Sequence, residues 1–326
     1  ANVKQILLLS TICCLFIFEE NLLRQQINNF EYFILILCAV LGLLFLVSSY
    51  DLISMYLAIE MQSLCLYVLA ASKKNSSFST EAGLKYFLLG SFSSALLLFG
   101  MSILYGCTGT TNFENYTILF SGVDVSIFST SESISIALLF VGAAFFFKIA
   151  AAPLHMWSPD VYEGSPTSST IFFAVIPKIA LFAVFIRMFQ TVFSSFEDTL
   201  LIMSIFFSIC SVIVGSFAAL RQRKLKRLLA YSSVSHVGYL LLAFSSNSLE
   251  GTHALFFYLV IYMITSLSLW SVILSINTST NIERSKTLID FASVSSLNPL
   301  IGLTGMIALF SLAGVPPLAG FYAKMV

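Results

Sequence analysis

The stretch FEYFILILCAVLGLLFLVS, residues 30–48, decides the fold class. It carries one charged side chain, Glu31, near its start and is otherwise almost wholly apolar. The hydrocarbon core of a bilayer is about 30 Å thick, so a helix that rises about 1.5 Å per residue needs about 20 residues to cross it. A run of this length and composition therefore predicts a membrane-spanning helix.

Similar runs recur along the whole chain. Of its 326 residues 58% are hydrophobic and 10% are charged, and the mean hydropathy is +0.94. A chain of this composition exposes more apolar surface than water tolerates, so it is stable in lipid. We therefore predict an all-α fold, a polytopic transmembrane helix bundle of about ten spans. The expected spans are residues 3–18, 30–48, 51–71, 82–105, 133–152, 167–190, 199–219, 227–245, 253–276 and 296–316.

Composition and motifs also limit the classes of function. The net charge is zero, which provides no general attraction for a nucleic acid. The six cysteines have no metal-binding spacing and mostly lie in apolar runs, as small buried hydrophobic residues do. The sequence contains no glycine-rich phosphate loop and no H-E-x-x-H motif. We expect no nucleic-acid partner, no metal and no cofactor bound by this chain.

The charges between the expected spans predict an orientation. Basic residues gather in alternate connections, and the opposite connections are acidic. The positive-inside rule places the basic side in the cytoplasm, or in the matrix of a mitochondrion. We expect the cluster at 221–227 to contact lipid headgroups. The longest connection, residues 106–132, has no periodic apolar face and is expected to be a solvent-exposed loop. The basic residues are Arg24, Lys73, Lys74, Arg221, Arg223, Lys224, Lys226, Arg227, Arg284 and Lys286.

Ionisable side chains within the apolar runs are the candidate functional residues. Glu60, Lys148 and Lys178 lie inside expected spans, and Lys324 lies just past the last one. A charge at membrane depth costs several kcal/mol unless it is paired or hydrated, and such charges usually mark ion or proton pathways. Lys85 lies about one turn inside its span, and its ammonium either extends to the basic side or takes part in function.

Prolines accompany the three lysines and predict helix breaks or kinks. Irregular backbone at membrane depth is tolerated where it lines protein or water, and transporters use it to build ion sites. Burial disfavours a charged lysine and a nearby carboxylate favours it, so moving Glu60 relative to Lys148 would load and unload a proton. A static ion pair that fixes helix register is the alternative. The prolines are Pro153, Pro177, Pro316 and Pro317.

A polar stretch around His236 suggests a second element of a proton path. Tyr231, Ser233 and Tyr239 lie within five residues of it. Because histidine titrates near neutral pH, these hydroxyl groups and the imidazole would form a hydrogen-bonded relay. Equally, the same side chains would join neighbouring helices.

Three motifs carry a resemblance to a known family. APLHMWSPDVYEGSPT (152–167), KRLLAYSSVSHVGY (226–239) and LAGVPPLAGFYAK (312–324) resemble the subunit 2 family of respiratory complex I, NADH:ubiquinone oxidoreductase. The likeness runs from about residue 30 to the end of the chain. It implies an antiporter-like membrane-arm subunit in the mitochondrial inner membrane that translocates protons. NADH, FMN, iron–sulfur clusters and ubiquinone would be used by other subunits. The implied partners are other membrane-arm subunits, including a neighbouring antiporter-like subunit, and lipids.

The resemblance also implies roles and repeats. Glu60 matches the family's membrane glutamate, Lys148 its partner in a broken helix, Lys178 the central lysine and Lys324 the outer lysine. The family is built from two inverted five-helix repeats. By this match residues 1–29 hold a first span and loop, residues 30–190 the first repeat, and residues 191–326 a second repeat that is incomplete after Lys324.

Competing functions remain open at this point. The same subunit of a plastid or bacterial complex shares all these features. A cation/proton antiporter subunit is a second class, which the DVYEGSP motif (160–166) disfavours. A purely structural bundle is a third class, and the charges at membrane depth argue against it.

Overall fold

The computed structural model describes residues 2–24, 30–120, 131–275, 287–288, 291 and 298–325. Within these ranges the chain is helical and forms no β-strand, so the prediction of an all-α fold is confirmed. Seven of the described helical segments are long and apolar enough to cross a membrane. Two shorter apolar helices, residues 2–18 and Pro299–Ala313, accompany them.

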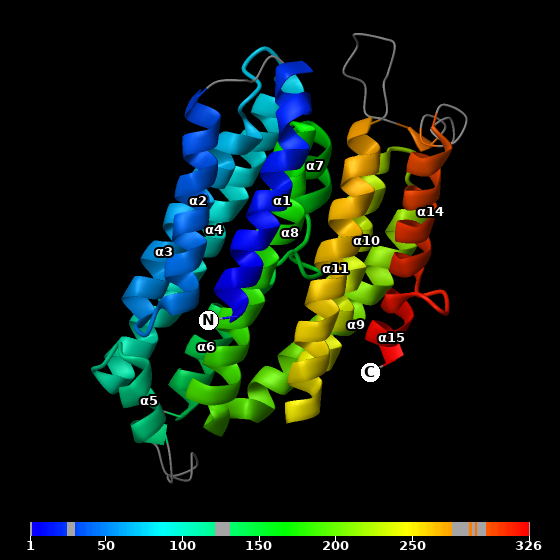
Figure 1. The fold of residues 1–326 in the computed structure, drawn as a ribbon. Coiled ribbons are helices and arrows are strands. Elements are labelled where there is room, and N and C mark those ends of the chain that lie inside the picture. The colour runs from blue at the N-terminus through cyan, green and yellow to red at the C-terminus, as the bar shows by residue number, and fades with distance from the viewer. Residues whose placement is uncertain are drawn as a thin grey trace.

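The helices run up and down in one bundle (Figure 1). Many apolar side chains on the outer faces are exposed, as lipid-facing side chains are in a membrane. The helices are α1 (Asn2–Arg24), α2 (Phe30–Ser48), α3 (Leu52–Ala70), α4 (Ser77–Thr108), α5 (Phe113–Phe120), α6 (Ser131–Lys148), α7 (Trp157–Gly164), α8 (Thr167–Ile186), a π-helix (Arg187–Val192), a 3₁₀ turn (Ser194–Phe196), α9 (Glu197–Leu220), α10 (Leu225–Ser245), α11 (Leu249–Ser275), α14 (Pro299–Ala313) and α15 (Ala319–Met325).

Helix α8 lies at the centre of the bundle. It packs against α1, α2, α3, α10 and α11, and nearly all of its side chains are buried. Hydroxyl groups in its first turn join it to its neighbours, because the Tyr32 hydroxyl on α2 donates to Ser168 Oγ at 2.9 Å and Ser169 Oγ donates to the Leu69 carbonyl on α3 at 2.9 Å. Every charged group on α8 therefore faces protein rather than lipid.

Helix α8 corrects one prediction. A helix break or kink was expected at Pro177, and no break occurs there, because α8 continues through this residue. A proline inside a helix removes one backbone hydrogen bond and costs about 3 kcal/mol. The burial of almost the whole helix offsets that cost, since neighbouring helices hold the backbone in place.

The other prolines lie in non-helical segments. Residues 149–156 separate α6 from α7 and contain Pro153, and Ala150 there has a φ of 63°. Residues 314–318 separate α14 from α15 and contain Pro316 and Pro317. Gly314 ends α14 with a φ of 83°, which glycine adopts readily. Lys148 is the last residue of α6, directly before the first interruption, and Lys324 lies in the short helix α15 after the second.

The expected loop at residues 106–132 contains a helix. Phe113, Tyr116 and Phe120 share one buried face of α5, at a spacing of three and four residues. Tyr116 and Phe120 pack against Phe193, at ring distances of 5.4 and 6.0 Å. The prediction of a plain loop is wrong for this part, because three aromatic side chains are enough to hold two helical turns on the bundle. Residues 121–130 lie outside the described residues.

The two ends of the bundle differ in charge. The α3–α4 and α9–α10 connections, which carry Lys73, Lys74 and the cluster at 221–227, lie at the same end as α7 (Figure 1). Glu250 and the Glu197–Asn247 hydrogen bond lie at the opposite end. This arrangement agrees with the alternation of basic and acidic connections; Arg284 and Lys286 lie outside the described residues.

Candidate functional site

Lys148 ends α6 beside a tyrosine. Its ammonium donates a hydrogen bond to the Tyr67 hydroxyl on α3 at 3.3 Å and lies 5.8 Å from the centre of that ring. Tyr67 is buried and Lys148 is half-buried. A tyrosine offers an ammonium a hydrogen-bond acceptor and an electron-rich face, yet carries no charge of its own.

Glu60 lies two helical turns from Tyr67 on the same face of α3. Among the described residues it forms no ion pair within 4.0 Å. Its Oε1 atom is enclosed and has no hydrogen-bond partner in the structure. The expected ion pair between Glu60 and Lys148 is therefore not formed in this structure. The Lys148 ammonium instead contacts Tyr67, which was not among the residues predicted from the sequence.

Lys178 lies in the middle of α8 and is 4% exposed. Its ammonium is 3.4 Å from the Tyr262 hydroxyl on α11 and 5.3 Å from the centre of that ring. The same hydroxyl lies 3.3 Å from the Ala174 carbonyl, one turn earlier in α8. No carboxylate pairs with Lys178 among the residues that the structure describes. Tyrosine is again the partner of a buried lysine.

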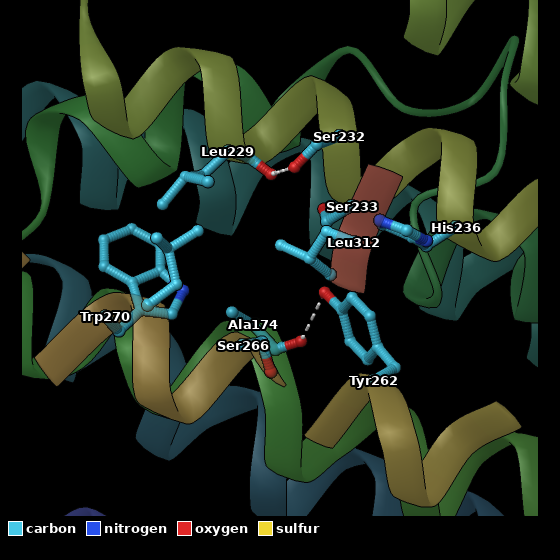
Figure 2. Close-up of a pocket in the computed structure, with 10 residues that line it drawn as sticks. Ala174, Leu229, Ser232, Ser233, His236, Tyr262, Ser266, Trp270 and Leu312 are labelled. Carbon is cyan, nitrogen blue, oxygen red and sulfur yellow. Dashed lines mark hydrogen bonds between the residues drawn. The ribbon is translucent and has the colours of Figure 1, made fainter. Parts of the chain in front are cut away.

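His236 and Tyr262 lie beside a small cavity between α8, α10, α11 and α14. Figure 2 shows His236 and Ser233 on α10 facing Tyr262 on α11. The two rings are 5.4 Å apart, and His236 Nδ1 lies 2.6 Å from the Tyr258 hydroxyl on α11. The cavity is lined by Ala174, Leu229, Ser232, Ser233, His236, Tyr262, Ser266, Leu269, Trp270 and Leu312.

Lys324 on α15 shows the same partner type. Its ammonium is 5.1 Å from the centre of the Tyr239 ring on α10. It also donates hydrogen bonds to the Leu312 and Ala313 carbonyls, at 2.8 and 3.1 Å. These are unsatisfied acceptors at the end of α14, where a positive charge is favourable. Lys324 therefore joins the two segments of a broken helix, α14 and α15, and also faces the Tyr239 ring.

The secondary candidates separate into two groups. Two of them lie near His236: the Tyr239 ring is 6.4 Å from that of Tyr258, and Ser233 lines the cavity. Tyr231 instead lies near His155, at a ring distance of 6.0 Å. Lys85 is half exposed and pairs with Glu81 at 2.8 Å.

A group of ion pairs lies at the basic end of the bundle. Arg227 on α10 contacts Asp160 and Glu163 on α7, at 3.3 and 3.2 Å. Lys224 also pairs with Glu163, and Lys85 on α4 pairs with Asp160 at 3.3 Å. These contacts form a charged clasp, composed of Lys85, Asp160, Glu163, Lys224 and Arg227. The clasp joins the short helix that follows Lys148 to α4 and α10.

The described residues contain no group of three or more histidine, cysteine or acidic side chains that would hold a metal ion. The clustered polar groups are instead lysine, tyrosine and histidine side chains at membrane depth. Such groups accept and donate protons, and neither a hydride nor an electron acceptor is needed for that chemistry.

Sequence comparison identifies the family of the chain. A family model described as NADH:quinone oxidoreductase/Mrp antiporter, transmembrane, matches residues 49–326. The chain belongs to this family. NADH-ubiquinone oxidoreductase chain 2 of Marchantia polymorpha is 47% identical over 98% of this chain, and the chain spans 64% of that protein's length. Subunit N of the NADH-quinone oxidoreductase of Paramagnetospirillum magneticum is 44% identical over 92% of this chain and 61% of its own. The resemblance predicted from the three motifs is confirmed.

Solved structures of the family share the fold. A chain of respiratory complex I from Thermus thermophilus has a TM-score of 0.81 and 34% identity, covering 99% of this chain and 68% of its own. A chain of an archaeal membrane-bound sulfane sulfur reductase has a TM-score of 0.79 and 26% identity, covering 92% of this chain and 62% of its own. The bundle is therefore a multi-pass membrane fold of the antiporter-like type.

Proposed function

We propose that the chain is part of a membrane-arm subunit of respiratory complex I that translocates protons, coupled to electron transfer from NADH to ubiquinone. One observation carries the proposal. Lys148, Lys178 and Lys324 each face a tyrosine ring, and none forms an ion pair within 4.0 Å among the described residues. A static structural charge at membrane depth would be expected to have a permanent counter-ion. Lysines without one are suited to gaining and losing protons.

A chain of contacts supports a route between two of these lysines. Lys178–Tyr262 and His236–Tyr258 are contacts between polar atoms, and the other steps are ring contacts. From Lys178 the route passes through Tyr262 to His236, whose Nδ1 contacts the Tyr258 hydroxyl at 2.6 Å. Tyr258 lies beside Tyr239, which faces Lys324. Hydroxyl and imidazole groups both donate and accept hydrogen bonds, so they carry protons in either direction.

Several finer features belong to the same proposal. We propose about ten spans and two inverted repeats, at residues 30–190 and 191–326, with residues 1–29 preceding them. The family relationship supports this division. The proposed partners are the other membrane-arm subunits, with NADH, FMN, iron–sulfur clusters and ubiquinone on other chains, and the proposed location is the mitochondrial inner membrane. The proposed location rests on the 47% identity to an NADH-ubiquinone oxidoreductase chain 2 from Marchantia polymorpha, and a bacterial subunit N is 44% identical.

A cation/proton antiporter subunit is the second candidate. The fold of a chain in the Mrp complex of Dietzia resembles this one with a TM-score of 0.75, at 24% identity. The two candidates differ in their coupling, because an antiporter exchanges sodium for protons without NADH. Pumping that depends on NADH and persists without sodium favours the first candidate.

Lys148→Ala in the full-length subunit tests the proposal. We expect the complex to assemble normally on a native gel, while proton uptake per NADH oxidised in sealed vesicles falls, because the site loses a group that exchanges protons. Lys74→Ala, on the exposed α3–α4 connection, is the matched loss of a lysine charge. If pumping per assembled complex is unchanged in Lys148→Ala, Lys148 has a structural role and the proposal fails for this site.

A further inference from the structure

Tyr67 has a second neighbour besides Lys148. Its ring packs into the surface of α4 where Gly90 leaves space. A Cβ atom on Gly90 would lie 2.6 Å from Tyr67 Cζ and 2.8 Å from Tyr67 Cε1, distances that real Cβ atoms do not adopt. The tyrosine hydroxyl that meets Lys148 is therefore seated in a notch that only glycine provides.

An aromatic chain fixes both Tyr67 and Lys148. The Tyr67 ring meets Tyr86 edge-on at 4.8 Å, and Tyr86 stacks on Trp157 at 4.7 Å with an interplanar angle of 12°. Trp157 Nε1 donates to the Phe147 carbonyl at 2.8 Å, directly before Lys148 in the chain. Because Lys148 in turn contacts the Tyr67 hydroxyl, these contacts form a closed ring that starts and ends at Tyr67. Such a ring of contacts sets the position of the ammonium against the tyrosine.

Tyr67 and Glu60 compete for this ammonium. They lie seven residues apart on one face of α3, which is about 10 Å along a helix axis. The Lys148 ammonium lies within hydrogen-bond distance of the Tyr67 hydroxyl and forms no ion pair with Glu60 within 4.0 Å. In the structure it contacts Tyr67, and the Glu60 Oε1 atom has no hydrogen-bond partner.

We propose that Tyr67, seated against Gly90, is a positioning residue that holds the Lys148 ammonium away from Glu60. The proposal rests on the proposed proton-translocating role of Lys148 and adds how its pairing is regulated. Lys148 then has two stable partners, one charged and one neutral, and the neutral one keeps the pair open. A lysine with two alternative partners is a two-state element, which a coupled pump requires.

Tyr67→Phe in the assembled complex is the direct test. The phenyl ring keeps the packing with Tyr86 and loses the oxygen that accepts from Lys148. In a cryo-EM structure of the variant complex we expect the Lys148 ammonium within ion-pair distance of Glu60, and we expect several-fold fewer protons pumped per NADH. Replacing Glu60 by Asp in the same variant shortens the carboxylate and should restore part of the pumping, whereas purely structural damage would not be relieved.

Gly90→Ala provides a second variant that leaves Tyr67 itself intact. The added methyl group displaces the tyrosine ring, so the same shift of Lys148 toward Glu60 is expected. Gly106→Ala, on the same helix, is the matched control because a Cβ there meets nothing within 4 Å. If Lys148 stays away from Glu60 in both variants, the positioning role of Tyr67 is wrong. If Lys148 moves to Glu60 but pumping is unchanged, Tyr67 has this role and the proposed function of Lys148 fails.

Discussion

Lysine and tyrosine side chains recur together at three places in the bundle. Lys148, Lys178 and Lys324 lie 5.1 to 5.8 Å from the centre of a tyrosine ring. A cation above an aromatic face gains about 2 kcal/mol when it is desolvated, which offsets only part of the several kcal/mol that burial of a charge costs. This balance applies most strongly to Lys178, which is buried, whereas Lys148 and Lys324 are half-buried.

Lys178 provides the clearest test of this arrangement. Lys178→Met keeps an unbranched side chain of similar length and removes the ammonium, so α8 should pack normally. Because proton transfer by a positioned side chain contributes roughly a hundredfold or more to a rate, we expect coupled proton pumping to fall by at least about tenfold. NADH-driven pumping in sealed vesicles, normalised to assembled complex, measures the loss. Normal pumping in this variant would exclude Lys178 from the proton route.

The charged members of the site could be predicted from sequence, and their partners could not. Glu60, Lys148 and Lys178 stand out because a charge in a long apolar run is costly and usually has a functional role. Tyr67, Tyr258 and Tyr262 lie in equally apolar runs, where a tyrosine fits the composition and gives no signal of its own. Only packing brings Tyr262 on α11 against Lys178 on α8. One signal was available for Tyr67, which lies seven residues after Glu60 and so shares its helix face.

Short helices that follow a break depend on contacts outside the helix. Helix α7 spans Trp157–Gly164, too short to be stable alone. Trp157 ties its start to α6, and the charged clasp ties its acidic side chains to α4 and α10. The clasp therefore holds the segment that follows Lys148.

Arg227→Ala tests the clasp. It removes two pairs with α7, each partly exposed and worth up to about 1 kcal/mol. We expect a complex that assembles but unfolds at a temperature a few degrees lower, with the loss reduced at high salt, which already screens these pairs. Arg223→Ala is the matched control, because Arg223 is exposed on the α9–α10 connection, four residues before Arg227, and forms no ion pair among the described residues. Equal unfolding temperatures for the two variants would show that the clasp contributes nothing.

The elements that sequence reasoning missed share a physical cause. Pro177 was expected to interrupt a helix, and α5 was expected to be a loop. Local preference decided both predictions, and tertiary packing overrode it in each case. The side chains around α8 supply more stabilisation than one proline removes, and the Phe193 ring gives Tyr116 and Phe120 a surface to cover. In long apolar runs local preference and tertiary packing both favour a helix, so the bounds of α2, α3, α9 and α10 were predicted to within a few residues.

At the scale of the whole molecule, the two ends of the bundle differ in charge, and the candidate site residues Lys178 and His236 lie between them. Basic connections gather at the end that holds α7, and Glu197 and Glu250 lie at the other. The positive-inside rule reads this asymmetry as an orientation in the membrane. The proposed route from Lys178 to Lys324 runs through side chains of α8, α10, α11 and α15.

Cysteine labelling tests this orientation. In a full-length subunit whose native cysteines are all replaced by alanine, Lys74→Cys and Glu250→Cys place single exposed thiols at the basic and acidic ends. We expect a membrane-impermeant maleimide to label Lys74→Cys only from the side on which NADH is oxidised, and Glu250→Cys only from the opposite side. The physical reason is that translocating a basic connection across the membrane is disfavoured, whereas acidic connections contribute little. Labelling in vesicles of both orientations measures the sidedness, and labelling after detergent treatment confirms that each thiol reacts. The reverse pattern would contradict the orientation, and labelling of both thiols from one side would contradict the arrangement of helices between them.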